Sequence, residues 1–125
     1  MSNAKQPGDP YRIAVDFDGV INSYVSGWTG ATDLPDPPVP GAIAWLEAMT
    51  KSFEVIIFTT RGQYPEARMA IRDWLAEHGY RGPVLTVTHE KPAALVYLDD
   101  RAIRFEGAFP SKEDIHRARP WRVEA

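Results

Sequence analysis

Two aspartates that directly follow an apolar segment raise the first chemical question of this sequence. The run 13–15 leads into Asp16 and Asp18, which are separated by Phe17 and followed by Gly19. Carboxylates gathered in one partly buried place cost free energy unless a cation joins them. A pair with this spacing is also common in caps and turns, so by itself it indicates either an ordinary turn or part of a metal site.

Other polar side chains stand beside later apolar segments of the chain: Thr59, Thr60, Lys91, Asp99 and Asp100. Each of them alone has an ordinary alternative role as a strand residue, a helix cap or a solvated lysine. If the apolar segments are parallel strands, however, their carboxyl ends meet at one edge of the sheet, where α/β folds bind ligands. The shared position of these residues at strand ends favours one functional site.

The donor atoms of this expected site indicate a hard cation. The chain has no cysteine, and the residues at the strand ends offer carboxylate and hydroxyl oxygens. Mg²⁺ prefers such ligands, keeps some of its waters and takes a phosphate oxygen as a further ligand. Side chains two positions apart in a strand, such as Asp16 and Asp18, point to the same side. A break at Gly19 would turn the Asp18 side chain toward a substrate and leave its backbone carbonyl facing the metal.

The strands and helices that position these residues are predicted from the apolar patterns. Strands are expected at residues 12–17, 53–58, 84–87, 95–98 and 102–105. Helices are expected at residues 42–51, at residues 65–78 and after Ser111. The second strand is apolar without alternation, as expected when helices cover both faces of a parallel sheet. The order of elements predicts an α/β fold, namely a three-layer Rossmann-like parallel sheet with helices on both faces and no large cap domain.

Local signals mark the boundaries of two of these helices. Pro65 suits the first turn of the second helix, and Gly79 suits its end. Ser111 and Asp114 are three residues apart, which predicts a capping box at the start of the last helix. These signals make helix boundaries predictable where the apolar pattern alone leaves them open.

The composition indicates one globular domain of ordinary type. The chain has 125 residues, of which 44% are hydrophobic and 25% charged, and its formal net charge is -3. We expect a single domain at residues 10–125, a preceding tail at residues 1–9 that contains a sequence resembling a cloning scar, and a Pro- and Gly-rich flap loop at about 20–40. No apolar run reaches the length of a membrane span. The lack of cysteine fits a reducing compartment, so we expect a cytoplasmic protein without a membrane partner.

In order and spacing, these features resemble the haloacid dehalogenase (HAD) superfamily from Arg12 to about Gly107. The similar motifs are an apolar strand ending in D-x-D-G at residues 15–20, a strand ending in Thr at 56–59, a lysine at 91 before the last core strand, and a strand ending in two acids at 96–100. The resemblance implies a HAD-like fold and a phosphatase that acts on phosphate monoesters.

The resemblance also implies catalytic roles for particular residues. Asp16 would be the nucleophile that forms an aspartyl-phosphate. Asp18 would be the general acid that protonates the leaving oxygen and then the base that activates water. Thr59 would hydrogen-bond the phosphoryl oxygens, with Thr60 as the alternative. Lys91 would stabilise the negative charge that builds during transfer.

For the metal, the resemblance implies Mg²⁺ held by Asp16, by the Asp18 carbonyl and by an acid of the last motif. We favour Asp100 as the direct ligand and Asp99 in a shared or outer role. Gly19 and Arg61 join Thr60 as expected substrate-binding residues, although Arg61 is equally suited to anchoring the flap loop.

The expected function is Mg²⁺-dependent hydrolysis of a small phosphate ester, with a nucleotide, a sugar phosphate or a phosphorylated nucleic-acid end as the substrate. The alternative is a metal-binding regulatory or interaction module of the same fold without significant turnover. Tyr24 and Trp28 of the flap are expected to pack the loop onto the domain, with stacking on a base or sugar as the alternative. The sequence leaves open the substrate, the oligomeric state and the choice between phosphatase and phosphotransferase.

Overall fold

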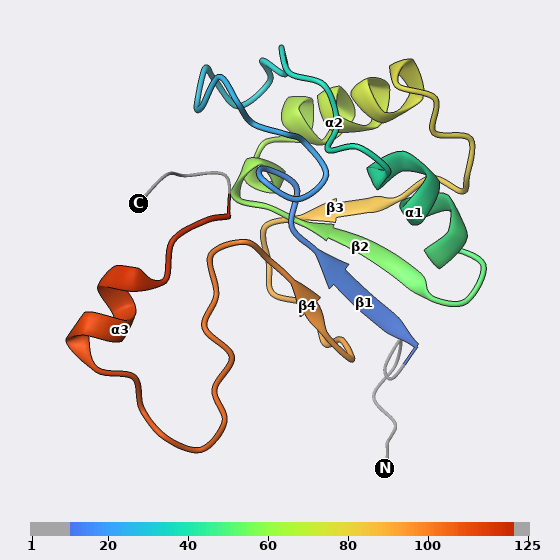
Figure 1. Cartoon of the computed structure of the whole chain (residues 1–125). Helices are drawn as coiled ribbons and strands as arrows, with labels where there is room; N and C mark the ends of the chain where they lie inside the picture. Colours follow the sequence, from blue (N-terminus) through green and yellow to red (C-terminus); the bar gives the residue numbers. More distant parts are fainter. Residues whose placement is uncertain (1–10, 122–125) are drawn as a thin grey trace.

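The computed structural model describes residues 11–121, so the expected tail at residues 1–9 lies outside the described residues (Figure 1). In chain order the elements are β1 (Arg12–Val15), α1 (Ala42–Met49), β2 (Glu54–Phe58), the 3-10 helix η1 (Thr60–Gln63), α2 (Pro65–Glu77), β3 (Thr86–Thr88), β4 (Tyr97–Leu98) and α3 (Lys112–Arg117). Within residues 11–121, every helix is too short or too polar to cross a membrane.

The four strands form one parallel sheet in the order β3-β2-β1-β4. Val15 of β1 is paired with Ile57 of β2 on one side and with Leu98 of β4 on the other. Ile57 is paired in turn with Val87 of β3. The carboxyl ends of all four strands therefore lie at the same edge of the sheet, and the expected α/β class is confirmed.

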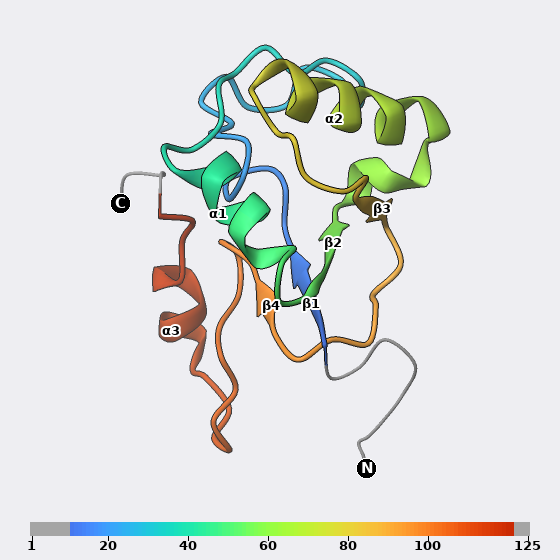
Figure 2. The same cartoon turned by 90° about the vertical axis from the view of Figure 1, so that its right-hand side faces the viewer.

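Helices α1 and α2 pack on one face of this sheet, as Figure 2 shows. Strand residues such as Val15 and Ile57 share a buried cluster with Leu46 of α1 and with Ile71 and Trp74 of α2. The crossovers from β1 to β2 and from β2 to β3 run in the same direction across the sheet. Because such crossovers are right-handed, both helices must lie on the same face.

The opposite face of the sheet is covered without a helix. Ala14 and Ile56, which alternate with the residues of the main cluster, are buried on this side. Residues 89–96 connect β3 to β4 and run along the same side without forming a helix (Figure 2). A helical crossover needs a dozen or more residues. The expected three-layer arrangement with helices on both faces is therefore not confirmed.

The residues that follow β4 differ most from the prediction. The strand expected at 102–105 is wrong, because Ile103 and Phe105 are 46% and 58% exposed and belong to no strand of the described chain. The capping box of α3 is confirmed, since Asp114 N–H donates to Ser111 Oγ (3.0 Å) and Ser111 N–H donates to Asp114 Oδ2 (3.1 Å).

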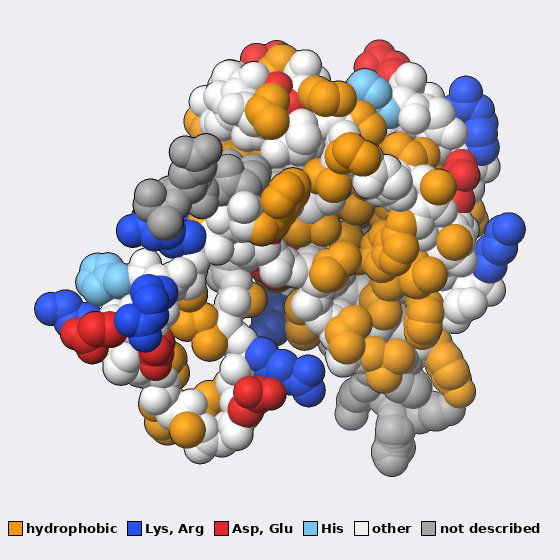
Figure 3. Space-filling model, viewed as in Figure 1, with side chains coloured by type: hydrophobic (Ala, Val, Ile, Leu, Met, Phe, Trp, Pro, Cys, Tyr) orange, Lys and Arg blue, Asp and Glu red, His pale blue; other side chains and the backbone are white. Residues whose placement is uncertain are grey.

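Helix α3 lies beyond the β4 edge of the sheet (Figure 1). Figure 3 shows charged side chains gathered on the part of the surface around α3 and apolar side chains over α1.

The difference in packing between α2 and α3 can be measured with one isoleucine from each helix. Ile71 of α2 is fully buried (0% exposed) and Ile115 of α3 is 57% exposed. We expect Ile71→Ala to lower the free energy of unfolding by about 2 to 5 kcal/mol. We expect Ile115→Ala to change it by no more than about 0.5 kcal/mol. Chemical denaturation checks both values, and equal losses in the two variants would contradict this division of the chain.

Candidate functional site

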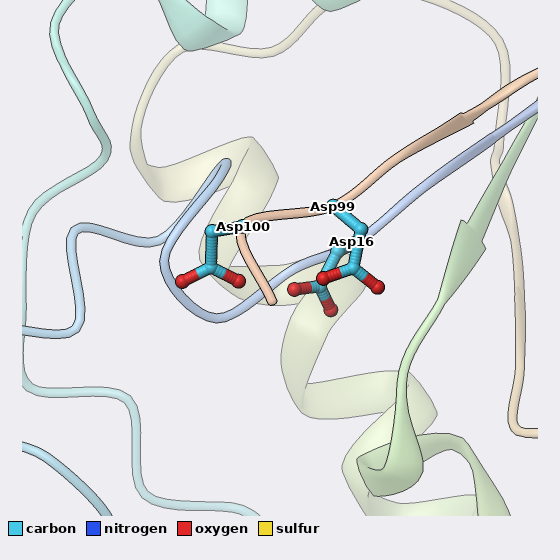
Figure 4. A group of neighbouring side chains, drawn as sticks. All are labelled: Asp16, Asp99 and Asp100. Carbon is cyan, nitrogen blue, oxygen red and sulfur yellow. The ribbon is translucent and has the colours of Figure 1, made fainter. Parts of the chain in front are cut away.

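Three carboxylates meet where β1 and β4 end. Asp16 directly follows β1 and Asp99 and Asp100 follow β4, and one oxygen from each side chain lies within 4.8 Å of the others. Asp16 N–H also donates to the Leu98 carbonyl at 2.8 Å, which extends the ladder between the strands. In the view of Figure 4 the carboxylate of Asp16 lies between those of Asp99 and Asp100. The strand register therefore brings together the acids that the sequence placed at separate strand ends.

The like charges in this cluster change the acidity of Asp16. Burial raises the pKa of Asp16 to about 8, helped by a hydrogen bond to Asp100 and by the charge of Asp99, while Phe17 N–H donates to Asp16 Oδ1 at 2.9 Å and acts in the opposite direction. The hydrogen bond between Asp16 and Asp100 exists only when a proton lies between their two carboxyl groups. Without the proton, both buried oxygens of Asp100 have no partner among the described residues. The cluster therefore needs a proton or a cation.

The residues present fit Mg²⁺ by the chemistry of their donors. All three side chains offer carboxylate oxygens, which this cation prefers. The unpartnered buried oxygens of Asp100 make it a suitable direct ligand, as expected from the sequence. Asp99 is exposed and already accepts a hydrogen bond from Arg101 N–H at 2.7 Å, which suits a shared or outer role. The predicted ligand role of the Asp18 carbonyl stays a prediction.

A pocket of about 370 Å³ opens beside the carboxylate cluster. Its lining includes five of the residues expected from the sequence: Asp16, Asp18, Thr59, Thr60 and Asp99. Thr59 is buried, and its hydroxyl oxygen accepts the Arg61 N–H at 3.3 Å. The hydroxyl hydrogen of Thr59 is then available to another acceptor, and Thr60 is exposed at the same pocket. Both threonines remain candidates for binding an anion.

Asp18 is engaged by two side chains. Its Oδ2 accepts a hydrogen bond from Arg61 Nε at 2.8 Å in an ion pair, and its Oδ1 accepts one from Asn22 Nδ2 at 3.0 Å. Asn22 is 1% exposed, and its Oδ1 accepts the Tyr24 N–H at 3.2 Å. Each of these oxygens keeps a second lone pair, so Asp18 can still accept a hydrogen bond from a molecule in the pocket while both contacts remain.

Arg61 anchors the flap loop. Besides Asp18, it binds the carbonyls of Gly30 (2.7 Å) and Ala31 (2.9 Å) through Nη1. Its guanidinium also lies over the ring of Trp28, 4.6 Å from the ring centroid. Arg61 is only 1% exposed. Of the two roles that the sequence allowed for this residue, the structure favours anchoring, and its role in substrate binding stays a prediction.

A second anchor holds the middle of the flap. Asp36 is buried and accepts hydrogen bonds from Ser26 N–H (2.9 Å) and Ser26 Oγ (2.6 Å). The Asp36 carbonyl accepts the Trp74 Nε1–H at 3.0 Å, which ties the flap to α2. The loop predicted at about 20–40 is thus held by buried polar contacts at several points. Sequence reasoning missed Asn22 and Asp36, because nothing in the local pattern shows that these two polar residues are buried.

Four predicted site residues lie outside the pocket lining: Gly19, Arg61, Lys91 and Asp100. Of these, Asp100 belongs to the carboxylate cluster and Arg61 anchors the flap. Lys91 is exposed, and its ammonium lies 5.0 Å from the centroid of the Tyr97 ring. Gly19 N–H donates to the Asn22 carbonyl at 2.8 Å, and the Gly19 carbonyl accepts the Trp121 Nε1–H at 2.6 Å. The roles expected for Lys91 and Gly19 stay predictions that this arrangement does not support.

Two other basic side chains line the pocket instead. Arg101 and His89 both contribute to its wall. Arg101 directly follows the two acids after β4, which was an available signal in the sequence. His89 directly follows β3. These two residues are therefore the cationic or cationisable groups that a bound anion would meet first.

Comparison of the chain with protein-family models, with curated proteins and with solved structures gives no match in any of the three. The function of the site is therefore inferred from its own geometry and from the motifs of the sequence.

Replacing Arg61 tests whether it holds the flap. Arg61→Met leaves Asp18 without its ionic partner, so we expect a loss of about 3 to 5 kcal/mol in the free energy of unfolding. We also expect faster chymotrypsin cleavage after Trp28, because the flap carbonyls lose their donor. Arg12→Met is the matched control, since the ion pair between Arg12 and Glu54 is more exposed (23% and 50%) and should be worth at most about 1 kcal/mol. Equal losses in both variants would contradict the anchoring role.

The raised pKa of Asp16 gives a second test. Because the folded-state pKa of about 8 exceeds the ordinary value of 3.8, the metal-free protein gains stability from this proton at low pH. That contribution is fully present below about pH 4 and is lost as the pH rises through about 8. A cation competes with the same proton, so we expect MgCl₂ to raise the melting temperature more at about pH 9 than at about pH 6.

The comparison uses thermal unfolding with EDTA and with MgCl₂ at both pH values. Asp16→Asn should remove most of the pH dependence of the magnesium effect. The control Asp73→Asn changes an exposed carboxylate of α2 and should preserve it. A magnesium effect that is the same at both pH values would show that Asp16 does not compete for the cation.

Proposed function

We propose that this protein is a Mg²⁺-dependent phosphomonoester hydrolase that works through an aspartyl-phosphate on Asp16. The observation that carries the proposal is the position of Asp16, which belongs both to the three-carboxylate cluster and to the lining of the pocket that contains Asp18 and Thr59. The residues proposed as nucleophile, proton-transfer group and hydroxyl donor thus line one pocket beside the carboxylate cluster, which supports the proposal. The proposal includes membership of the HAD superfamily, which rests on the motifs of the sequence.

The proposed reaction has two displacement steps. An Asp16 oxygen attacks the phosphorus, the bond from phosphorus to the leaving oxygen breaks, and Asp18 gives its proton to that oxygen. In the second step Asp18 takes a proton from water as the water oxygen attacks phosphorus, and the bond to Asp16 breaks. The hydroxyl of Thr59 donates to a phosphoryl oxygen in both steps. When bound, Mg²⁺ supplies the positive charge that the carboxylates and the phosphoryl oxygens share.

A second candidate is a metal-binding module of the same fold that does not turn over a substrate. The engagement of both Asp18 oxygens by Arg61 and Asn22 favours this alternative, because these contacts already give Asp18 a structural role in holding the flap. The position of Lys91 outside the pocket favours it as well. The alternative predicts magnesium binding through the carboxylate cluster without release of phosphate.

Turnover of p-nitrophenyl phosphate distinguishes the two candidates. We expect hydrolysis that requires MgCl₂, stops with EDTA and falls to background in Asp16→Asn, because the amide cannot form the phosphoenzyme. Asp18→Asn should reduce the rate by about 10²- to 10⁴-fold through loss of proton transfer. Asp73→Asn, a carboxylate on the exposed side of α2, is the control and should keep the wild-type rate.

Two outcomes would reject the proposed reaction. A rate that survives in Asp16→Asn would remove the nucleophile from the mechanism. Magnesium binding by calorimetry with no turnover of phosphate monoesters would establish the metal-binding module instead. Addition of an alcohol acceptor, with analysis for the transferred phosphoryl group, separates hydrolysis from phosphotransfer.

A further inference from the structure

Part of the pocket lining is aromatic. Tyr24, Trp28 and Phe58 line the same pocket as Asp16 and Thr59. The sequence favoured packing as the role of the flap aromatics, but Trp28 is 57% exposed and is not part of the hydrophobic core. An exposed indole that lines a pocket is available for contact with a ligand.

Trp28 is contacted by a side chain that is itself fixed. The Arg61 guanidinium lies against the ring, 4.6 Å from its centroid, and is itself fixed by Asp18 and by the carbonyls of Gly30 and Ala31. The exposure of Trp28 leaves the rest of the indole accessible. Such an arrangement reduces the cost of ordering the ring when a ligand binds.

Tyr24 is linked to the Asp18 carboxylate through Asn22. Its φ of +61° lies in the left-handed region, which is uncommon for a residue other than glycine. Conformations of this kind persist where the surroundings impose them, and they concentrate at ligand clamps. Asn22 accepts the Tyr24 N–H and donates to Asp18. The two flap aromatics are therefore positioned relative to Asp18, through Asn22 and through Arg61.

We propose that Trp28, with Tyr24 beside it, forms a stacking subsite for a nucleobase, so that the substrate is a nucleoside monophosphate. This inference rests on the proposed function for the phosphate half of the site. A sugar phosphate offers only C–H groups to an indole, whereas every nucleobase offers a flat π face that stacks more strongly. The pocket of about 370 Å³ has room for more than a phosphate group. The net charge of -3 gives no general attraction to a polynucleotide backbone, which favours a free nucleotide.

The test compares two ligands that differ only in the base. Binding of adenosine 5′-monophosphate and of ribose 5-phosphate is measured by calorimetry with MgCl₂ in Asp16→Asn, which keeps an oxygen toward the cation and cannot form the phosphoenzyme. We expect the nucleotide to bind at least about fivefold more tightly, as stacking on one aromatic side chain allows. Trp28→Leu in the same background should reduce this ratio toward one, and Trp28→Phe should retain a clear preference.

The matched control is Phe109→Leu, which removes an aromatic ring that is 87% exposed and lies outside this pocket; it should leave the ratio unchanged. Equal affinities for the two ligands in the presence of intact Trp28, or a preference that survives in Trp28→Leu, would overturn the subsite. A ratio lost equally in Trp28→Phe and Trp28→Leu would also overturn it, because it would show that the indole only supports the flap.

A further readout separates failure of the subsite from failure of the proposed hydrolase. Adenosine, which has no phosphate, is examined with the wild-type protein by saturation-transfer NMR. Contact that depends on Trp28, in a protein that hydrolyses no phosphate ester, would support the subsite and reject the hydrolase. Equal kcat/KM values for the nucleotide and for ribose 5-phosphate would support the hydrolase and reject the subsite.

Discussion

The parallel register of the central strand determines where every charged group of the site lies. Val15 is paired on both sides, with Ile57 and with Leu98, so the residues that follow β1 and β4 have to be neighbours. The ladder thereby forces Asp16 against Asp99 and Asp100 even though like charges at this distance repel each other. Backbone hydrogen bonds and the burial of the sheet core offset that repulsion. The electrostatic repulsion that remains acts between these three carboxylates, and a single divalent cation bound there would neutralise it.

Arg61 is the second residue on which the arrangement depends, because its buried guanidinium contacts both Asp18 and the flap loop. A buried guanidinium is unfavourable unless its donors are satisfied, and Arg61 satisfies them with the Asp18 carboxylate and with flap carbonyls. The same side chain therefore joins the flap carbonyls to the Asp18 carboxylate, so a change in the position of the flap would change the surroundings of Asp18.

The parts of the fold that follow from local sequence were predictable, and those that depend on chain direction were not. The strand ends at Phe58 and Leu98 and the Ser111 capping box are local properties, and the structure agrees with them. The first strand, in contrast, ends at Val15 and not at the expected residue 17. The apolar run around Ile56 suggested helices on both faces, yet burial of Ile56 requires only that some segment covers it. The direction of the crossovers decides which faces carry helices, and no local pattern encodes that direction. Lys91 was placed by resemblance, whereas its position depends on the path of a connection that is too short for a helix.

The acidity of Asp16 links metal binding to nucleophilic strength. With a pKa of about 8, the metal-free carboxyl group of Asp16 is mostly protonated at pH 7. A protonated carboxyl group is a poor nucleophile. Under the proposed function, a cation that displaces this proton would supply positive charge and free the Asp16 oxygen in the same event. A change at Asp99 or Asp100 would then alter both cation binding and nucleophilic attack, because both residues act on the acidity of Asp16.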